Sequence, residues 1–107
     1  MYDSLKELVN VPIMYKKFVS TDSYGYSTFE DPIDILVYVE GKINTVVNVA
    51  GETVTSMSTV YIDNVINGNT FNIGYNDILI IGGISRRILA LNSFFRNAIV
   101  DVWVVYI

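Results

Sequence analysis

The chain has 107 residues, a net charge of −4, no Cys and no His, and it is 51% hydrophobic but only 17% charged. The missing residue types exclude disulfides, thiolate nucleophiles, zinc sites with their usual ligands and an imidazole base, and the acidic balance argues against dedicated nucleic-acid binding. The length predicts a single domain, residues 1–107. Because soluble domains carry roughly 25% charged residues, we expect part of the apolar surface of this domain to be covered by other subunits.

The first segment predicts little regular structure and no export. The acidic start "MYDSLKELVN" lacks the basic and apolar regions of a signal peptide, and a chain without Cys suits a reducing cytosol, so we expect synthesis in the cytoplasm. Ser4 to Glu7 matches a capping box. The sequence is equally compatible with a short helical turn before Pro12 and with no helix there. The longest apolar run, Ile78 to Ile84, is too short for a membrane helix of about 20 residues, and we expect no membrane partner.

Strand signals begin after this segment. Residues 12–19 look extended, whereas residues 20–32 are rich in Ser, Asp, Gly and Pro and predict a loop. In "IDILVYVE" (33–40), every second residue from Ile33 to Val39 is β-branched and apolar. This alternation indicates a strand with one buried face.

Hairpin signals follow in the middle of the chain. The stretch "NTVVNVAGETVTS" (44–56) is rich in Val and Thr, which favour strands, and its turn at Gly51 predicts a hairpin. Residues 63–77 are dense in Asn and Gly and predict a loop that carries turns. The segments 78–81 and 84–92 flank a Gly-Gly pair and predict a second, tight hairpin.

The final strand, 97–107, is apolar on both faces apart from Asp101, so it should be central or covered on both sides. We expect its last residues to pair with something outside the chain. Trp103, Val105 and Ile107 are therefore candidates for a subunit interface, with core packing as the alternative for Trp103. About six strands without helical periodicity predict an all-β fold, either a small barrel or a sandwich.

No motif in the sequence carries a recognisable chemistry. Asp63, Asn67 and Gly68 match three positions of a calcium loop, but Val65 and Gly74 stand where ligands belong. An ordinary Asn- and Gly-rich turn explains this segment better. We expect no metal site and no cofactor.

Other charged residues also have simple explanations. The acids Glu30, Asp31 and Asp34 could supply a glycosidase pair, although a solvated loop around Pro32 accounts for them. Two adjacent cations, Arg86-Arg87, would point to opposite faces of a strand, which suits charges that protect a sheet edge better than a phosphate site. Ser and Thr lack a His to activate them. We therefore expect no catalytic residue and no enzyme activity.

Three features in chain order carry a resemblance that covers about Ile13 to Ile107. They are the Asp-x-x-Gly corner at Asp22 to Gly25, the strand "TVYI" before a loop, and the "G-x-x-D-I-L" step at Gly74 to Leu79 that leads into a hairpin. Together they resemble the head-closure, or stopper, group of head-tail connector proteins of tailed bacteriophages and prophages, also called head-completion proteins. The loop "NVINGNTFN" departs from the Pro-containing loops of that group.

The resemblance implies a virion neck protein that forms a homo-oligomeric ring beneath the portal and adaptor proteins. Such a ring closes the capsid after DNA packaging, offers a docking surface to a tail-completion or tail-terminator protein, and lets double-stranded DNA pass without sequence-specific binding. An acidic ring suits this task because it would not retain phosphates. For this chain we expect the hairpin residues Val49, Ala50, Gly51, Glu52 and Thr53 to enter the channel or contact a neighbouring subunit, with a solvent-exposed hairpin as the alternative.

Two other functions are compatible with the sequence. One is a different tail or collar component of a phage or a phage-tail-like particle. The other belongs to a different class, an OB-like barrel that binds single-stranded nucleic acid. Salt-dependent binding to oligonucleotides would identify the second, and the acidic net charge counts against it.

Overall fold

The computed structural model describes residues 11–48, 50–66, 68–96 and 99–107, and this part of the chain is all-β, with no helix. The predicted option of a helical turn at Ser4 to Glu7 lies outside the described residues. The thirteen strands are β1 (Val11–Lys16), β2 (Phe18–Thr21), β3 (Ser27–Phe29), β4 (Ile33–Glu40), β5 (Asn44–Val47), β6 (Thr53–Ser56), β7 (Thr59–Asp63), β8 (Val65–Ile66), β9 (Asn69–Thr70), β10 (Ile78–Ile81), β11 (Ile84–Arg87), β12 (Ala90–Arg96) and β13 (Ile99–Tyr106).

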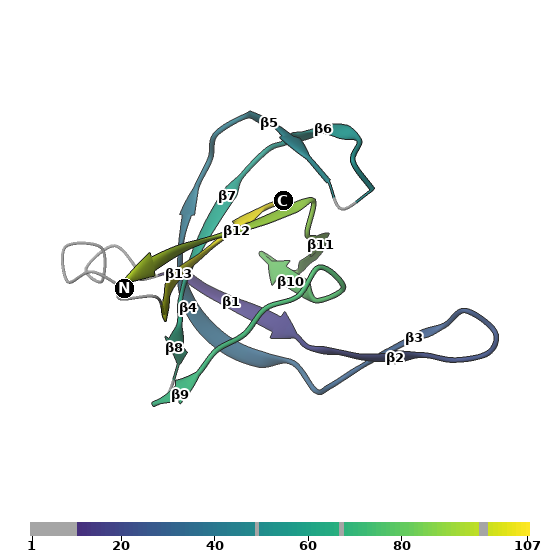
Figure 1. Cartoon of the computed structure of the whole chain (residues 1–107). Helices are drawn as coiled ribbons and strands as arrows, with labels where there is room; N and C mark the ends of the chain where they lie inside the picture. Colours follow the sequence, from purple (N-terminus) through teal and green to yellow (C-terminus); the bar gives the residue numbers. More distant parts are fainter. Residues whose placement is uncertain (1–10, 49, 67, 97–98) are drawn as a thin grey trace.

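Seven of these strands form one curled antiparallel sheet, a half-barrel, in the order β11-β10-β1-β4-β7-β13-β12 (Figure 1). The two edge strands, β11 and β12, are joined through Ile88 and Leu89, and the Leu89 amide donates to the Tyr106 carbonyl at 2.8 Å. The chain therefore passes directly from one edge of the curled sheet to the other. Three small sheets, β2-β3, β5-β6 and β8-β9, stand apart from it as separate hairpins.

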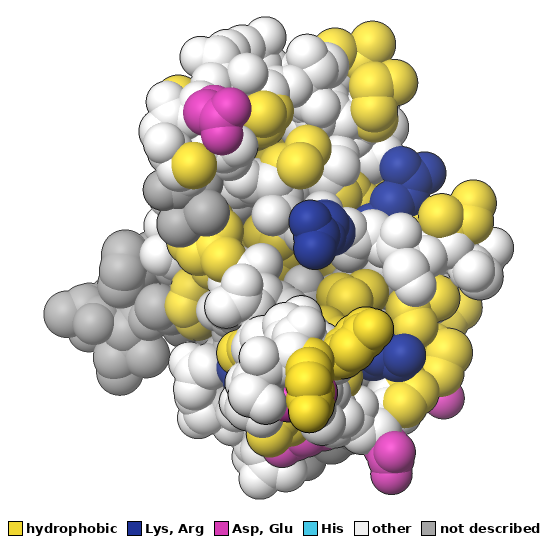
Figure 2. Space-filling model, turned by 90° about the vertical axis from the view of Figure 1, so that its right-hand side faces the viewer, with side chains coloured by type: hydrophobic (Ala, Val, Ile, Leu, Met, Phe, Trp, Pro, Cys, Tyr) yellow, Lys and Arg dark blue, Asp and Glu magenta, His cyan; other side chains and the backbone are white. Residues whose placement is uncertain are grey.

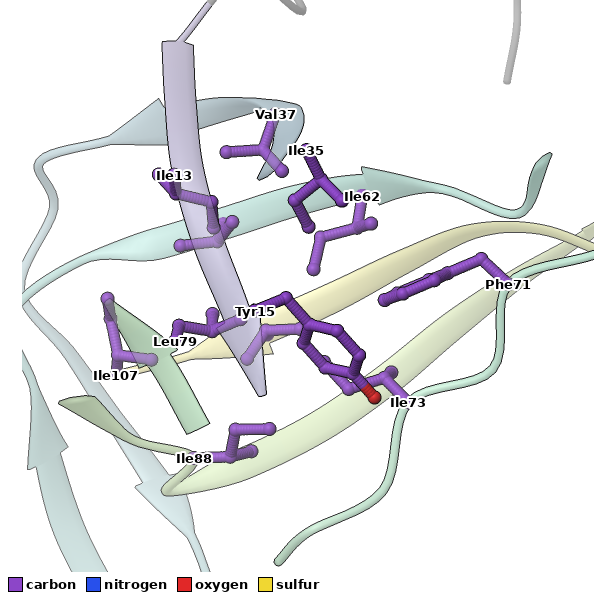
Figure 3. Close-up of a cluster of buried hydrophobic side chains, with 12 residues drawn as sticks. Ile13, Tyr15, Ile35, Val37, Ile62, Phe71, Ile73, Leu79, Ile88 and Ile107 are labelled. Carbon is purple, nitrogen blue, oxygen red and sulfur yellow. The ribbon is translucent and has the colours of Figure 1, made fainter. Parts of the chain in front are cut away.

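The core lies inside the curve of this sheet (Figure 3). Alternate residues of the strands point into it, beginning with Ile13 and Tyr15 of β1 and with Ile35 and Val37 of β4. Each fully buried aliphatic side chain of this kind contributes about 1.5–3 kcal/mol. The buried hydrophobic cluster is completed by Val60, Ile62, Phe71, Ile73, Leu79, Ile88, Val105 and Ile107.

Several predicted elements are confirmed. β4 buries Ile35 and Val37 as the alternation indicated, although Ile33 at the start of the strand is 47% exposed. The Val- and Thr-rich stretch forms the β5-β6 hairpin. The second hairpin, β10-β11, turns at Gly82 and Gly83, whose φ angles of 59° and 78° are those that a two-residue type I′ turn requires.

Two predictions about the elements need correction, and a third is confirmed. Residues 20–32 are not a plain loop, because β2 and β3 pair within them. The predicted strand 84–92 divides at Ile88 and Leu89, where the chain leaves β11 and enters β12. The loop at 63–77 was predicted correctly, and its turns include the short β8-β9 pair.

The last strand, β13, is paired on both sides, and from Val102 to Tyr106 its side chains are buried or half-buried on both faces, as its composition predicted. It pairs with β7 on one side and with β12 on the other. Val105 fills the inner core, whereas Val104 packs on the outer face in a second cluster with Val102, Tyr61 and Tyr106. Both faces of the strand are therefore committed within this chain.

The expectation that the final residues pair outside the chain is wrong for Ile107. Its amide donates to the Ser58 carbonyl at 3.0 Å, and its carbonyl accepts from the amides of Met57 at 2.9 Å and Ser58 at 3.2 Å. The buried hydroxyl of Ser56 donates to the same carbonyl at 2.9 Å. The hydrogen-bonding groups of Ile107 are thus used inside the subunit.

Candidate functional site

The hairpin around Gly51 is a separate two-stranded sheet above the main sheet (Figure 1). Its turn is held by Asn48, whose side-chain oxygen accepts from the amides of Ala50 at 3.0 Å and Glu52 at 2.9 Å. Gly51 has a φ of 81°, which favours glycine. The predicted contact residues Ala50, Gly51, Glu52 and Thr53 are all exposed.

One predicted residue of this hairpin, Val49, lies outside the described residues. Beside the turn, Val47 is 61% exposed, and at the opposite end of the hairpin Met57, which follows β6, is 56% exposed. Glu52 is the one charged side chain between residues 44 and 56. The hairpin therefore offers a nearly uncharged surface of small, mostly polar side chains, with Val47 as its large exposed apolar residue.

A second hairpin, β2-β3, has the same kind of turn. Asp22 takes the place of Asn48, and its Oδ1 atom accepts from the amides of Tyr24 and Tyr26, both at 2.9 Å. The Asp22 amide donates to the Tyr26 carbonyl at 2.9 Å, and the Gly25 amide donates to the Asp22 carbonyl at 3.1 Å. This is a three-residue hairpin loop with glycine in the left-handed position, φ 85° at Gly25.

We call residues 18–29 the arm, because this hairpin projects from the barrel (Figure 1). At its tip, Tyr24 is 86% exposed and Tyr26 is 73% exposed. Viewed along the arm, hydrophobic side chains gather at the tip and beside it, and Lys and Arg side chains lie around it (Figure 2). The prediction of a loop at 20–32 overlooked the arm. Asp22 to Gly25 and Asn48 to Gly51 share the pattern Asx-x-x-Gly, which would have predicted two similar turns.

A groove of about 290 Å³ lies between the strands of the arm, from Phe18 and Phe29 to Thr21 and Ser27, and the residues of 75–78 and of the end of β11. One wall holds Phe18 and Phe29, whose rings pack edge to face with centroids 5.9 Å apart. Tyr75, Ile78 and Arg87 line the opposite side. The groove is thus mixed in character, with aromatic walls, polar groups and one guanidinium.

Asp77 lies in the floor of this groove and is 3% exposed. Its carboxylate accepts from the Phe18 amide at 2.8 Å, from the Gly74 amide at 2.7 Å and from the Tyr15 hydroxyl at 2.5 Å. The Lys17 ammonium is 3.5 Å away. Three donors and a cation compensate the burial of this charge, so Asp77 fastens the base of the arm to the barrel.

Burial raises the pKa of Tyr15 well above its ordinary value, and the hydrogen bond to Asp77 and the negative charge of that carboxylate raise it further. The Tyr15 phenol therefore stays protonated and donates to Asp77. Within the described residues, the hydrogen bonds of Asp77 and Tyr15 join groups of this chain to one another. The cluster therefore has a structural role. The sequence analysis singled out the segment from Gly74 to Leu79 as a motif, but it did not predict that the Asp77 carboxylate is buried.

The three residues predicted as a possible subunit interface lie mainly in the core. Val105 is fully buried and Ile107 is 6% exposed, so both fill the interior of their own chain. Trp103 is half-buried, packs against the same cluster and donates its indole N–H to the Phe71 carbonyl at 2.8 Å. Trp103 thus packs with the core, as the alternative expected, while part of its surface stays exposed, and Val105 and Ile107 present almost no surface to a neighbour.

The remaining charged candidates are spread over the surface. Glu30, Asp31 and Asp34 are exposed, and so are Arg86 and Arg87 on the edge strand β11. In the described ranges no three metal-ligating side chains come together. Asp63, from the calcium-like pattern, instead accepts a hydrogen bond from the Val65 amide at 3.2 Å.

In comparisons with known proteins, no family model and no curated protein matches the chain. No helix in the described part of the chain is long and apolar enough to cross a membrane. The fold and the two projecting hairpins are therefore the observations on which a function must be argued.

Proposed function

We propose that this chain is a subunit of the head-tail connector of a tailed bacteriophage or prophage, of the head-closure or stopper group. In this proposal it is a structural, non-enzymatic protein of the virion neck, made in the bacterial cytoplasm. Copies form a ring between the portal and adaptor proteins and a tail-completion or tail-terminator protein. The order of segments described above supports this assignment.

The observation that carries the proposal is the pair of hairpins that stand off one half-barrel. Both turns are fixed by an Asx side chain, at Asp22 and at Asn48, and both hairpins expose large apolar side chains, Tyr24 and Tyr26 on one and Val47 on the other. Exposed apolar surface on preorganised elements is suited to protein contacts. A ring subunit needs such contacts with its neighbours and with the rings above and below it.

The β5-β6 hairpin is our candidate for the element that enters the channel or contacts a neighbour. It has no cation between residues 44 and 56. A surface without Lys or Arg gains nothing from phosphate neutralisation, so double-stranded DNA could pass it without being retained. The net charge of −4 acts in the same direction.

The proposal is tested by measuring mass in solution with light scattering, first for the chain alone and then with a portal-adaptor complex encoded beside it. Recruitment of several copies to that complex is the expected result. A chain that stays monomeric and ignores the complex would contradict the proposal. Negative-stain images of the mixture would show whether the recruited copies form a ring.

The exposed aromatic residues favour one second candidate, an OB-like barrel for single-stranded nucleic acid. Tyr24, Tyr26 and Phe94 are exposed, and stacking of bases on such rings supports single-strand binding. That function also needs a basic groove, whereas the groove here contains Arg87 beside Asp77. Binding of oligonucleotides that weakens steeply with salt would favour this candidate over the connector, or over another tail or collar component.

A further inference from the structure

The tip of the arm is a hydrogen-bonded turn with exposed aromatic side chains. Hydrogen bonds within the turn fix the backbone from Asp22 to Tyr26, so little conformational entropy is lost when it is bound. Tyrosine is among the residues enriched at protein interfaces and their hot spots, and both tip tyrosines are mostly exposed. Asp22 uses Oδ1 for the turn, while no described residue donates to its Oδ2 atom.

The groove at the base of the arm has the size and lining to receive such a tip. Its volume of about 290 Å³ lies just below the roughly 300–1,000 Å³ of small-molecule sites, which suits the few side chains of a turn better than a cofactor. Phe18 and Phe29 offer aromatic faces, and Arg87 offers a guanidinium. A guanidinium pairs with a carboxylate through two parallel hydrogen bonds and also stacks on tyrosine rings.

The arm tip and the groove carry charges of opposite sign. Asp22, at the tip, is the one charged residue of the arm, and Glu30 and Asp31 follow directly after it. The adjacent strand β11 carries Arg86 and Arg87, both exposed and without a carboxylate partner among the described residues. The Asp22 carboxylate at the tip and the Arg87 guanidinium in the groove attract each other when they belong to different molecules.

We propose that the arm tip of one copy docks in the groove of the next copy, with Tyr24 and Tyr26 against the aromatic wall and Asp22 against Arg87. The tip projects away from the barrel (Figure 1), and residues 22–26 are not among those that line the groove of their own copy, so the contact joins two different patches on two copies. Such heterologous contacts generate rings when the rotation closes. The inference rests on the proposed ring, for which it names the contact between subunits.

Single-cysteine variants test this contact without background, because the chain has no cysteine. Tyr24→Cys protein is mixed with Arg87→Cys protein under mild oxidation, both free in solution and after recruitment to the portal-adaptor complex. We expect a covalent dimer of the two variants as the main product. Glu52→Cys, on the exposed turn of the other hairpin, replaces Arg87→Cys in the matched control and should give no such product. Far-UV circular dichroism checks that each variant is folded.

The outcomes separate the contact from the function. Recruitment in several copies without the Tyr24–Arg87 cross-link, or with Tyr24 linked to Tyr24 or to another protein, would overturn the docking but leave the connector proposal intact. Failure of recruitment would count against the connector. As a second measurement, Arg87→Glu should weaken self-association about tenfold or more, since it places like charges together, and an unchanged association would contradict the contact.

Discussion

At the scale of single residues, Asp77 shows how the chain holds a charge inside the protein. It is the one carboxylate buried in the described residues, and its partners come from β1, from the base of the arm and from its own turn. Removal of a partner from a buried donor costs about 1–3 kcal/mol for each group left unsatisfied. Asp77 therefore has a large structural role for one side chain.

Asp77→Ala should lower the free energy of unfolding by at least about 3 kcal/mol, because it leaves two amides and the Tyr15 hydroxyl without their acceptor. Urea denaturation measures the change. Asp34→Ala, on the exposed outer face of β4, is the control and should stay within about 0.5 kcal/mol of the wild type. Equal effects of the two substitutions would contradict the role assigned to Asp77.

The raised pKa of Tyr15 predicts a loss of stability in alkali. A raised pKa in the folded state means that the unfolded chain releases the Tyr15 proton first, at its ordinary value of about 10. Stability is thus fully present below about pH 10 and falls as the pH rises above it, by at most about 1.4 kcal/mol per pH unit for this group. Denaturation curves from pH 8 to pH 11.5 measure the fall.

Tyr15→Phe should be less stable at neutral pH, because it removes the donor to Asp77, but its stability should fall less steeply in alkali. Part of the slope should persist, since burial also raises the pKa of Tyr61. Tyr24→Phe removes an exposed phenol and serves as the control. An alkaline slope that is the same with and without the Tyr15 hydroxyl would refute the explanation.

At the scale of elements, the arm and the β5-β6 hairpin are variants of one design. Each has an Asx side chain that accepts two amide hydrogen bonds and a glycine in the left-handed region three residues later. Neither hairpin is part of the main sheet. Their conformation is therefore determined largely by local hydrogen bonds, and they can be altered with little effect on the barrel.

Gly51→Ala should destabilise the β5-β6 hairpin by about 1–2 kcal/mol, because an L-residue at φ 81° is strained. A new Cβ there would meet no atom within 4 Å, so backbone strain is the cause rather than a clash. Faster hydrogen exchange of the β5 and β6 amides measures the effect. Gly41→Ala, also free of contacts and without a positive φ, should leave that exchange unchanged.

Deletion of residues 49–53 tests the hairpin as a functional element. Because β5 and β6 pair only with each other, the deletion should leave the unfolding transition of the barrel nearly intact. On the proposed function it should impair ring formation or the retention of packaged DNA. The measurement is the yield of filled particles from a phage that carries the deletion, and normal virions would show that the hairpin has no such role.

At the scale of the whole molecule, the half-barrel is closed by contacts between distant parts of the chain. The phenol of Tyr15 reaches Asp77, the indole of Trp103 reaches the Phe71 carbonyl, and Ile107 pairs with Ser58. The last strand lies between β7 and the edge strand β12, and from Val102 onward its side chains are buried or half-buried on both faces. The apolar surface left for partners lies on the two hairpins and on the outer face of the sheet, at residues such as Leu36 and Met14.

Val105→Ala tests whether this strand serves the core or an interface. A core position predicts a loss of about 1–3 kcal/mol of unfolding free energy in the chain alone, with no separate effect on association among the molecules that remain folded. Calorimetry and light scattering on the same samples distinguish the two roles. A variant of normal stability with weakened association would restore the interface interpretation.

The sequence by itself determined the all-β class, the alternating face of β4 and the hairpins at 44–56 and 78–87, because side-chain periodicity and turn chemistry are local properties. The same local rules predicted a loop at residues 20–32 because of its Ser and Asp residues. The short hairpin there is defined only by the pairing of β2 with β3. The tertiary structure alone decided the rest. The groove, the burial of Asp77 and the placement of Val105 and Ile107 in the core depend on residues such as Phe18 and Asp77, which are 59 positions apart and meet only after the sheet has curled.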